Sequence, residues 1–405
     1  MNAERLTPLL VGTCPAEWKQ PYIEEITELL TNGFVGTSLP HQIENSKTGI
    51  RYLQGFNVRP NKLELTRTTW VTHEFNAQNL KSQLREGDIL VVQSGHIGTA
   101  AVVTEEAAGS NCHAVIICRF KSDIVDPDFA SQYLNSQIGQ ARLRGLHVGS
   151  SLPHINTGEL GRFKLPLPPL HEQKVLAQLW ITWDTAIQKT EQLIAVKERH
   201  LAHFRDRLLR NPERASPIKL RDVTQELTAR NGTSLGRDAI MAVTKQIGLR
   251  PMREETIAAS IERYKRVPPR AFAYNPMRLN IGSIAVSQFD HEVLVSPDYV
   301  VFACDEFRLL PGYLHHLRFT RNWKNQFEFA GNGSVRVRIY YDDLGRFSFE
   351  LPLIEVQQRI VRFLDAAAHE VKLLREEAEA HRTQKRGLMQ KLLTGKWRLP
   401  GVNNE

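Results

Sequence analysis

Apolar residues recur every seven positions along residues 170–210, and further apolar residues fill the positions between them. This spacing is typical of a helix that lies along another helix. Pro166, Pro168 and Pro169 suit the approach to a first helical turn, where Glu172 complements the positive end of the helix dipole. We therefore predict a long helix with a seam made of Leu176, Trp180, Trp183, Ile187, Ile194, Leu201, Phe204 and Leu208.

The chain repeats this stretch without a gap, because Gly161 aligns with Gly345 and fixes an offset of 184 residues. Lys385 interrupts the seam of the second copy, so we expect looser pairing there. Ordinary helices are shorter and rarely come as duplicates in register, which disfavours two unrelated amphipathic helices. We predict two antiparallel helices of about 60 Å that form a coiled coil. The second seam consists of Ile360, Leu364, Val371, Leu388 and Leu392.

Short apolar runs alternate with turn residues before the first long helix. The pattern predicts strands at 88–92, 100–103 and 114–118 and a helix at 127–143, followed by a polar loop. Residues 213–350 repeat this plan, with 282–288 as the counterpart of 87–93 and 311–319 as the counterpart of 127–135. The expected fold class is α/β (α+β), with globular domains at 1–166 and 213–352 separated by helical regions at 167–212 and 353–405.

The composition of this chain of 405 residues indicates its cellular compartment and the class of its binding partner. Its net charge is +8 and its pI is near 9.3, which favours an anionic partner such as nucleic acid. The N-terminal residues lack the apolar run of a signal sequence, and no 18 apolar residues run together. The four cysteines form no CxxC pair. We expect a cytoplasmic protein with no membrane contact, disulfide or zinc site.

The duplication suggests how such a chain could bind double-stranded DNA. Two copies of one module joined by antiparallel helices are related by a pseudo-twofold axis, and B-DNA carries local twofold axes. Because the two globular segments differ in sequence, they would read two different half-sites. Loops rich in Arg, Lys, Asn, Ser and Gly suit phosphates and base edges, although any solvated loop has a similar composition. One of them, 44–52, contributes the candidates Lys47 and Arg51.

Motifs for catalysis are not evident in the sequence. No GxxxxGK[ST] phosphate loop and no HExxH zinc motif occurs. Asn275-Pro276-Met277-Arg278 is only a faint match to the NPP[YF] tetrapeptide of amino-methyltransferases, and a structural turn explains it better. We therefore predict neither a catalytic residue nor a metal site in this chain.

The assembled pattern resembles the specificity subunit of type I restriction-modification systems over nearly the whole chain. The resemblance rests on LPLPPLHEQKVL and its repeat LPLIEVQQRIVRFLD, on the ending QKRGLMQKLLTGKWRL, and on GDILVVQSGHIG and FAYNPMRLNIGSIAVS. It implies two target recognition domains that read a bipartite, asymmetric DNA sequence. Two modification subunits carrying S-adenosylmethionine and restriction subunits using ATP-Mg would bind this chain, which itself would hold no cofactor.

The resemblance also directs attention to particular loops as candidates for DNA contact. Within the first domain they contribute Ser94, His96, Arg144, His147 and Ser150, and within the second Asn275, Arg278, Ser287, Gln288, Lys324 and Arg336. Asn275 and Ser150 could instead only close turns. The half-site sequences and the gap between them do not follow from the sequence.

Two rival functions belong to other classes. A free-standing sequence-specific DNA-binding regulator would bind tightly without partners, which the modest net charge disfavours. A methyltransferase or nuclease acting alone would need the catalytic motifs that are missing.

Overall fold

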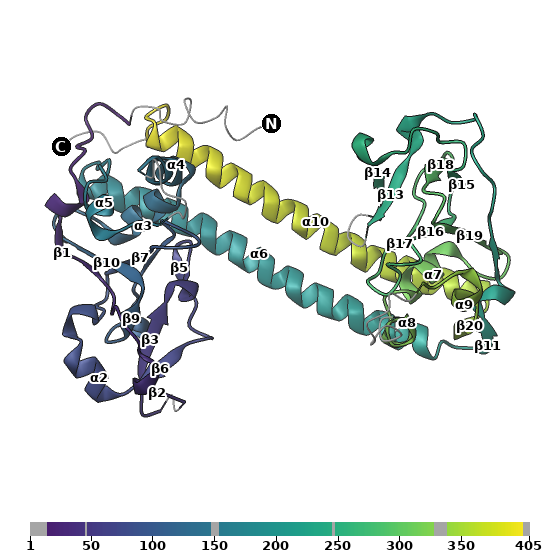
Figure 1. Cartoon of the computed structure of the whole chain (residues 1–405), viewed down its shortest axis with the longest axis horizontal. Helices are drawn as coiled ribbons and strands as arrows, with labels where there is room; N and C mark the ends of the chain where they lie inside the picture. Colours follow the sequence, from purple (N-terminus) through teal and green to yellow (C-terminus); the bar gives the residue numbers. More distant parts are fainter. Residues whose placement is uncertain (1–13, 45–46, 147–153, 245–247, 328–337, 400–405) are drawn as a thin grey trace. The chain divides into compact units, whose positions relative to one another are not determined.

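The structure is a computed structural model that describes residues 14–44, 47–146, 154–244, 248–327 and 338–399 (Figure 1). It divides into two compact units, and each unit combines one globular segment with part of both long helices. Unit 1 comprises Met1–Lys189 and Glu377–Glu405, whereas unit 2 comprises Thr190–Glu376. The long helices are α6 (Leu170–Arg210) and α10 (Ile354–Leu393).

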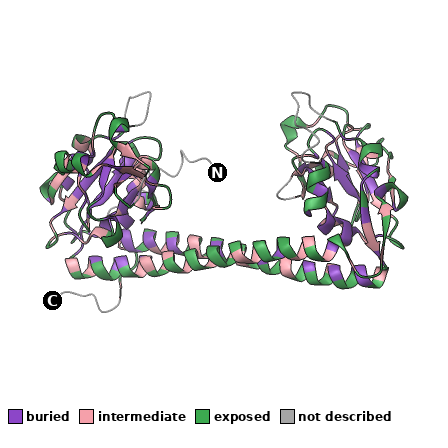
Figure 2. Ribbon diagram, turned by 90° about the horizontal axis from the view of Figure 1, so that it is seen from below, coloured by how far each residue is buried: buried purple, intermediate pink, exposed green. Residues whose placement is uncertain are grey.

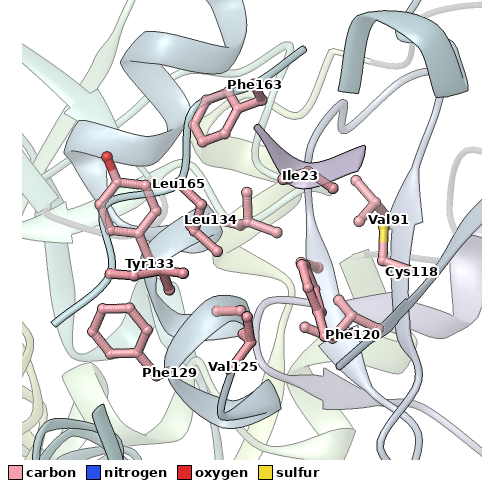
Figure 3. Close-up of a cluster of buried hydrophobic side chains, with 14 of the residues drawn as sticks. Ile23, Val91, Cys118, Phe120, Val125, Phe129, Tyr133, Leu134, Phe163 and Leu165 are labelled. Atoms are coloured by element: carbon pink, nitrogen blue, oxygen red, sulfur yellow. The ribbon is translucent and has the colours of Figure 1, made fainter. Parts of the chain in front are cut away.

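The core of unit 1 is an antiparallel four-stranded sheet in the order β1-β10-β7-β8. These strands are β1 (Thr27–Asn32), β10 (Val115–Phe120), β7 (Ile89–Val92) and β8 (Ala100–Val102). All four residues of β7 are buried, because one face packs on helices and the other on a second apolar cluster. Figure 3 shows part of the helix-facing cluster, in which Leu134 of α3 (Pro127–Asn135) and Val91 of β7 take part.

A second sheet completes unit 1, in the order β2-β6-β3-β9. It consists of β2 (Gln42–Ile43), β6 (Thr69–Val71), β3 (Ile50–Gln54) and β9 (Asn111–His113), and only the β3–β9 pair is parallel. A small hairpin of β4 (Val58–Arg59) and β5 (Lys62–Leu63) and helix α2 (His73–Gln78) accompany it.

Unit 2 has the same central sheet, in the order β12-β19-β16-β17. Its strands are β12 (Thr224–Glu226), β19 (Val300–Cys304), β16 (Phe272–Tyr274) and β17 (Ile284–Val286). Three two-stranded sheets surround it: β11 (Ala215–Lys219) with β20 (Ser348–Pro352), β13 (Met241–Thr244) with β14 (Gly248–Pro251), and β15 (Lys265–Val267) with β18 (Val293–Val295). Figure 2 shows that buried residues concentrate inside each globular segment. The predicted α/β class with a duplicated plan is therefore confirmed.

Helix positions repeat at the 184-residue offset. Helix α3 begins at Pro127 and α7 (Pro311–Leu317) at Pro311, and α5 (Thr157–Gly161) matches α9 (Tyr341–Gly345) end to end. Helix α4 (Gln137–Gly145) likewise matches the start of α8 (Arg321–Phe327). The single helix predicted at 127–143 is wrong, because Ser136 adopts an extended backbone and its hydroxyl caps α4 by accepting from the Gly139 N–H.

Strand pairing corrects the predicted alignment of the two sheets. In unit 2, Ala273 of β16 faces Val301 and Ala285, just as Leu90 of β7 faces Ile117 and Ala101 in unit 1. Strand β17 is therefore the counterpart of β8, and the sequence match of 282–288 to 87–93 was wrong by one strand. The match misled because both segments start with a glycine in a left-handed conformation, Gly87 and Gly282, and continue with apolar residues.

The long helices run antiparallel within each unit. In unit 1, Asp184 of α6 contacts Lys385 of α10, and Glu172 nearer the start of α6 contacts Arg398 beyond the end of α10. In unit 2, Lys197 pairs with Glu370, and the rings of Phe204 and Phe363 lie 5.2 Å apart. All of the predicted seam residues are buried or half-buried. Among the described residues, no helix is long and apolar enough to cross a membrane.

Each unit contains one polar cluster that connects both long helices to its globular segment. In unit 1 the Lys385 ammonium donates to Asp184 at 2.6 Å and to Gln132 of α3 at 3.0 Å. Lys385 is buried, and this burial lowers its pKa although Asp184 opposes the shift. The expectation of looser pairing at Lys385 is therefore contradicted, because the ammonium joins three elements.

The corresponding cluster in unit 2 has the same plan with other residues. The His316 Nε2–H of α7, the counterpart of Gln132, donates to Asp365 of α10 at 2.9 Å. The Arg205 Nε–H of α6 donates to His316 Nδ1 at 3.2 Å. Here the cation comes from α6 and the carboxylate from α10, which is the reverse of unit 1. Each helix thus presents complementary groups that fit one register of the other.

A buried glutamine fixes the first turn of each long helix. Gln173 accepts from the Asp126 N–H at 2.9 Å and donates to the carbonyls of Ile124 and Pro168. Gln357, at the 184-residue offset, accepts from the Leu310 N–H and donates to the carbonyls of Arg308 and Pro352. These bonds tie the segment before α3 or α7 to the long helix.

Replacing Gln173 by alanine is expected to lower the free energy of unfolding by about 3 kcal/mol, because buried backbone groups lose their partner. Gln188→Ala on the exposed side of α6 should change the free energy by less than about 0.5 kcal/mol. Urea denaturation followed by circular dichroism measures both values. Equal effects of the two substitutions would argue against the anchoring role of Gln173.

Candidate nucleic-acid interface

Two equivalent loops contain four of the predicted DNA-contacting residues. In unit 1, residues 93–99 connect β7 to β8 and carry Ser94 and His96. In unit 2, residues 275–283 connect β16 to β17 and carry Asn275 and Arg278. The structure therefore places two pairs of candidates, chosen separately from the sequence, at the same position of a duplicated sheet.

The β7–β8 loop is held by hydrogen bonds at both ends. The Ile155 N–H donates to the Gln93 carbonyl at 3.0 Å, and the Ser94 hydroxyl lies 2.8 Å from His154 Nδ1. Gly98 has a φ of +74°, and a β-carbon there would lie 2.7 Å from a methyl carbon of Leu143. A larger residue at 98 would both strain the backbone and push the loop away from α4.

The β16–β17 loop has a corresponding anchor. The Ile339 N–H donates to the Pro276 carbonyl at 3.1 Å, and Ile339 is the 184-residue counterpart of Ile155. Asn275 is half-buried, and its side-chain oxygen accepts from the Met277 N–H at 2.9 Å. Asn275 therefore closes a turn, which agrees with the structural alternative considered for it.

Exposed side chains differ between the two loops. Ser94 and His96 are exposed in unit 1, whereas unit 2 exposes Arg278, Met277 and Ile281. Arg278 makes no ion pair within the described part of the chain. A guanidinium can donate a bidentate pair of hydrogen bonds to guanine, and apolar groups suit the thymine methyl or a base step. The two loops therefore offer different chemistry on equivalent supports.

Three other candidates lie on the surface outside these loops. Lys47 is exposed, and Arg144 is exposed near the end of α4. Lys324 is also exposed, although it lies on helix α8 and not on the predicted loop. Buried Trp323 and Phe327 hold that helix to the core, a spacing that the surrounding polar residues obscured in the sequence.

Arg51 is engaged inside unit 1. Its guanidinium donates to the Glu106 carbonyl at 2.8 Å and to the Glu106 carboxylate at 3.2 Å, and it lies 5.5 Å from the centre of the Trp70 ring. Only 18% of the side chain is exposed. Arg51 thus supports the second sheet in this structure, and a DNA contact would require it to leave these partners.

Two candidates at the end of β17 do not join the loops. Ser287 is buried, and its N–H donates to the Ala271 carbonyl at 2.7 Å, so we withdraw it as a direct DNA contact. Gln288 is exposed, but it follows β17, whereas the 275–283 loop precedes that strand. His147, Ser150 and Arg336 lie outside the described residues.

Other residues beside these two loops were not among the candidates predicted from the sequence. His154 bonds to Ser94, and exposed Arg338 and Tyr340 flank Ile339, which anchors the β16–β17 loop. The 184-residue repeat indicates these residues, because it aligns residues 154–156 with residues 338–340. Neither segment has enough hydrophobic periodicity to predict a pairing with a loop more than 50 residues away.

Unit 2 also contains buried titratable groups behind its loop. Burial next to Arg205 lowers the pKa of His316 to about 4, and burial next to Arg318 lowers that of His315 to about 2. Asp365 opposes the shift of His316 through its hydrogen bond. Both histidines are therefore neutral at pH 7 and leave the arginines as the cations of this region.

Unit 2 is expected to lose stability as the pH falls from about 6.5 towards about 4. The unfolded histidines bind protons in this range while the folded ones do not, which costs about 1.4 kcal/mol per pH unit for each histidine. His316→Gln introduces the residue found at position 132 and should remove the part due to His316. Urea unfolding at several pH values measures this, and an identical pH profile for the variant would contradict the assignment.

The described residues contain no group of three or more His, Cys, Asp or Glu side chains placed to hold a metal ion. Cys112 and Cys118 are buried thiols whose burial raises their pKa, and no disulfide joins the four cysteines. What the arrangement offers is surface loops with donors, aromatic rings and cations on a rigid sheet.

Comparison with known proteins places this arrangement among described families. Residues 15–198 match the sequence model of the type I restriction modification DNA specificity domain. The putative type I restriction enzyme MjaX specificity subunit of Methanocaldococcus jannaschii is 22% identical, over 96% of both chains. The MjaVIII specificity subunit of the same organism is 24% identical over 44% of this chain and 42% of that relative. The EcoBI specificity subunit of Escherichia coli is 23% identical over 51% of this chain and 43% of that relative.

Solved structures share the fold. The S subunit of a type I restriction-modification system from M. genitalium matches 93% of this chain and 96% of its own, with a TM-score of 0.55 and 12% identity. A chain from a structure that describes complex assembly of the type I R-M system matches 95% of this chain and 100% of its own length, with a TM-score of 0.57 and 14% identity. The similarity thus extends over both units and both long helices.

Proposed function

Because the chain belongs to the family of type I restriction-modification specificity subunits, we propose that it reads a bipartite, asymmetric sequence in double-stranded DNA. Unit 1 would read one half-site and unit 2 the other. The observation that carries this proposal is the duplicated sheet, whose equivalent β7–β8 and β16–β17 loops expose unlike side chains. Equivalent supports suit two half-sites of one duplex, and unlike side chains suit two different sequences.

The helices supply the second part of the proposal. Their polar clusters hold α6 and α10 in one register within each unit, so the helices can set the distance between half-sites. The exposed faces of α6 and α10 would bind two modification subunits, and restriction subunits would join that complex. This use of the helices fits their continuous length of 41 and 40 residues.

The chain itself would position DNA and carry out no reaction. In this proposal the modification subunits bind S-adenosylmethionine and methylate adenine N6, and the restriction subunits use ATP-Mg. The pairing of Ser94 with His154 is explained by loop anchoring, since both side chains are exposed and no carboxylate orients His154 within the described residues.

Labelled methyl transfer to duplex DNA tests the proposal. We expect incorporation only when the chain and its modification subunits are combined, and none with the chain alone. Incorporation of labelled methyl groups by the chain alone would show that the chain is itself a methyltransferase. Tight, sequence-specific binding that does not change when the modification subunits are added would instead favour a free-standing regulator.

A further inference from the structure

Unit 2 contains a basic groove outside the β16–β17 loop, and among the DNA-contact candidates that the structure describes only Lys324 lies in its lining. The end of α6, helix α8 and strand β20 enclose a volume of about 1210 Å³. Its exposed cations are Arg199, Arg207, Arg210, Arg321 and Lys324. Asp206 and Glu350 are the acidic residues of the lining, so the formal balance of these seven residues is positive.

Most of these cations have no acidic partner. The Arg321 guanidinium pairs with the Asp206 carboxylate at 3.2 Å. The backbone N–H of Arg321 also donates to this carboxylate at 2.8 Å. Within the described residues, Arg199, Arg207, Arg210 and Lys324 make no ion pair. Exposed cations packed around one hollow repel each other, and a bound polyanion would relieve that repulsion.

The duplication provides an internal control for this charge. Unit 1 has a matching groove of about 730 Å³, in which Ile138, Pro166 and Thr394 occupy the positions of Asn322, Glu350 and Arg210. The positions of Arg321 and Lys324 are held by Gln137 and Gln140 in unit 1. Arg207 keeps a basic counterpart, Lys391, and the unit 1 groove is lined by Arg142 and Arg398. Arg142 donates to the Tyr133 hydroxyl and Arg398 pairs with Glu172, so both cations are engaged inside unit 1. The two grooves therefore differ in their unpaired cations.

The groove lies next to the β16–β17 loop within unit 2. The Arg318 guanidinium donates to the carbonyl of Ile284, the first residue of β17 after that loop, at 2.7 Å. The same guanidinium lies 4.1 Å from the centre of the Phe319 ring, which lines the groove. One arginine side chain thus spans the distance between the end of the loop and the groove.

We propose that this groove binds the phosphate backbone of duplex DNA beside the half-site read by the β16–β17 loop. The inference rests on the proposed function, and it adds a contact that one unit makes and the other does not. Arginine and lysine side chains, together with Asn322 and Asn325 in the lining, are the usual partners of phosphate oxygens. Unit 2 would supply affinity along the backbone, and both loops would supply specificity.

The test compares two variants of the full chain assembled with its modification subunits. Arg207→Gln with Lys324→Gln removes two groove cations. Arg221→Gln with Arg346→Gln removes two exposed cations elsewhere in unit 2, whose side chains are 53% and 68% exposed. Fluorescence anisotropy measures the affinity for a duplex with the target site and for a scrambled duplex between about 0.05 and 0.2 M salt.

The groove variant is expected to lower the slope of log affinity against log salt by about 2, with unchanged preference for the target over the scrambled duplex. Its loss of affinity relative to wild type should therefore differ about tenfold between the two ends of the salt range. The control variant should keep the wild-type slope.

Other outcomes overturn the inference in separate ways. A wild-type slope in the groove variant, with specific binding intact, refutes the groove and leaves the proposed function standing. Loss of the modification subunits in gel filtration, again with a wild-type slope, would assign the groove to an acidic protein surface. Wild-type chains that do not prefer the target duplex would instead refute the proposed function.

Discussion

A seven-residue insertion in both long helices is expected to widen the gap between the two half-sites by about three base pairs. Seven helical residues add about 10 Å, and the duplex rises about 3.4 Å per base pair. A whole heptad also returns the apolar seam to the same face. The insertions belong between Lys189 and Thr190 and between Glu376 and Glu377, where the compact units divide.

This position leaves both polar clusters intact, because Asp184 and Lys385 stay in unit 1 and His316 and Asp365 stay in unit 2. The matched control is the same insertion in α6 alone. It shifts α6 against α10 by two turns, so the two clusters cannot form together, and we expect little methylation. Mapping of methylated sites reads out both variants, and an unaltered gap in the double insertion would exclude a spacing role for the helices.

Replacing Arg278 by alanine is expected to weaken binding by about 1–3 kcal/mol, or about 5-fold to 150-fold. Arg278 is the exposed cation of the β16–β17 loop, and its backbone is fixed by bonds to Asn275 and Ser283. A side chain on a fixed support loses little entropy on binding. The preference for one base should be lost at one position of the half-site read by unit 2. The base preferences in the other half-site should stay unchanged.

Methylation of duplex libraries, with one half-site randomised at a time, measures this effect. Arg346→Ala is the matched control, because that exposed arginine pairs with Asp343 at 3.2 Å on α9 and not on the loop. An equal loss of preference in both half-sites would show that Arg278 acts on the protein as a whole. Unchanged preference in both would remove Arg278 from the interface.

The long helices and the duplication were predictable from sequence, because heptad spacing depends on one repeating physical requirement. The residues that we assigned to the seam, the first being Leu176 and the last Leu392, are all buried or half-buried. Helices also begin 184 residues apart, as at Pro127 and Pro311. Buried Gln173 and Gln357 also align, although only the structure shows that they bond to equivalent backbone groups.

The short strands were harder to align, because a run of three or four apolar residues fits any buried strand. Phe272–Tyr274 and Ile284–Val286 both fit the pattern of Ile89–Val92, and hydrogen-bond partners were needed to choose between them. Ser287, predicted from the resemblance alone, lies just after the second of these strands and is buried. Lys385 was misjudged for another reason, since its partners Asp184 and Gln132 are more than 200 residues away in sequence.

The central claim is that two unlike reading surfaces act on one duplex at a set distance. A genome-wide map of N6-methyladenine, in cells that carry this chain with its modification subunit, tests that claim most directly. We predict one motif made of two different half-sites with a gap of constant length. A motif without a gap, a symmetric motif, or half-sites at variable distances would contradict it.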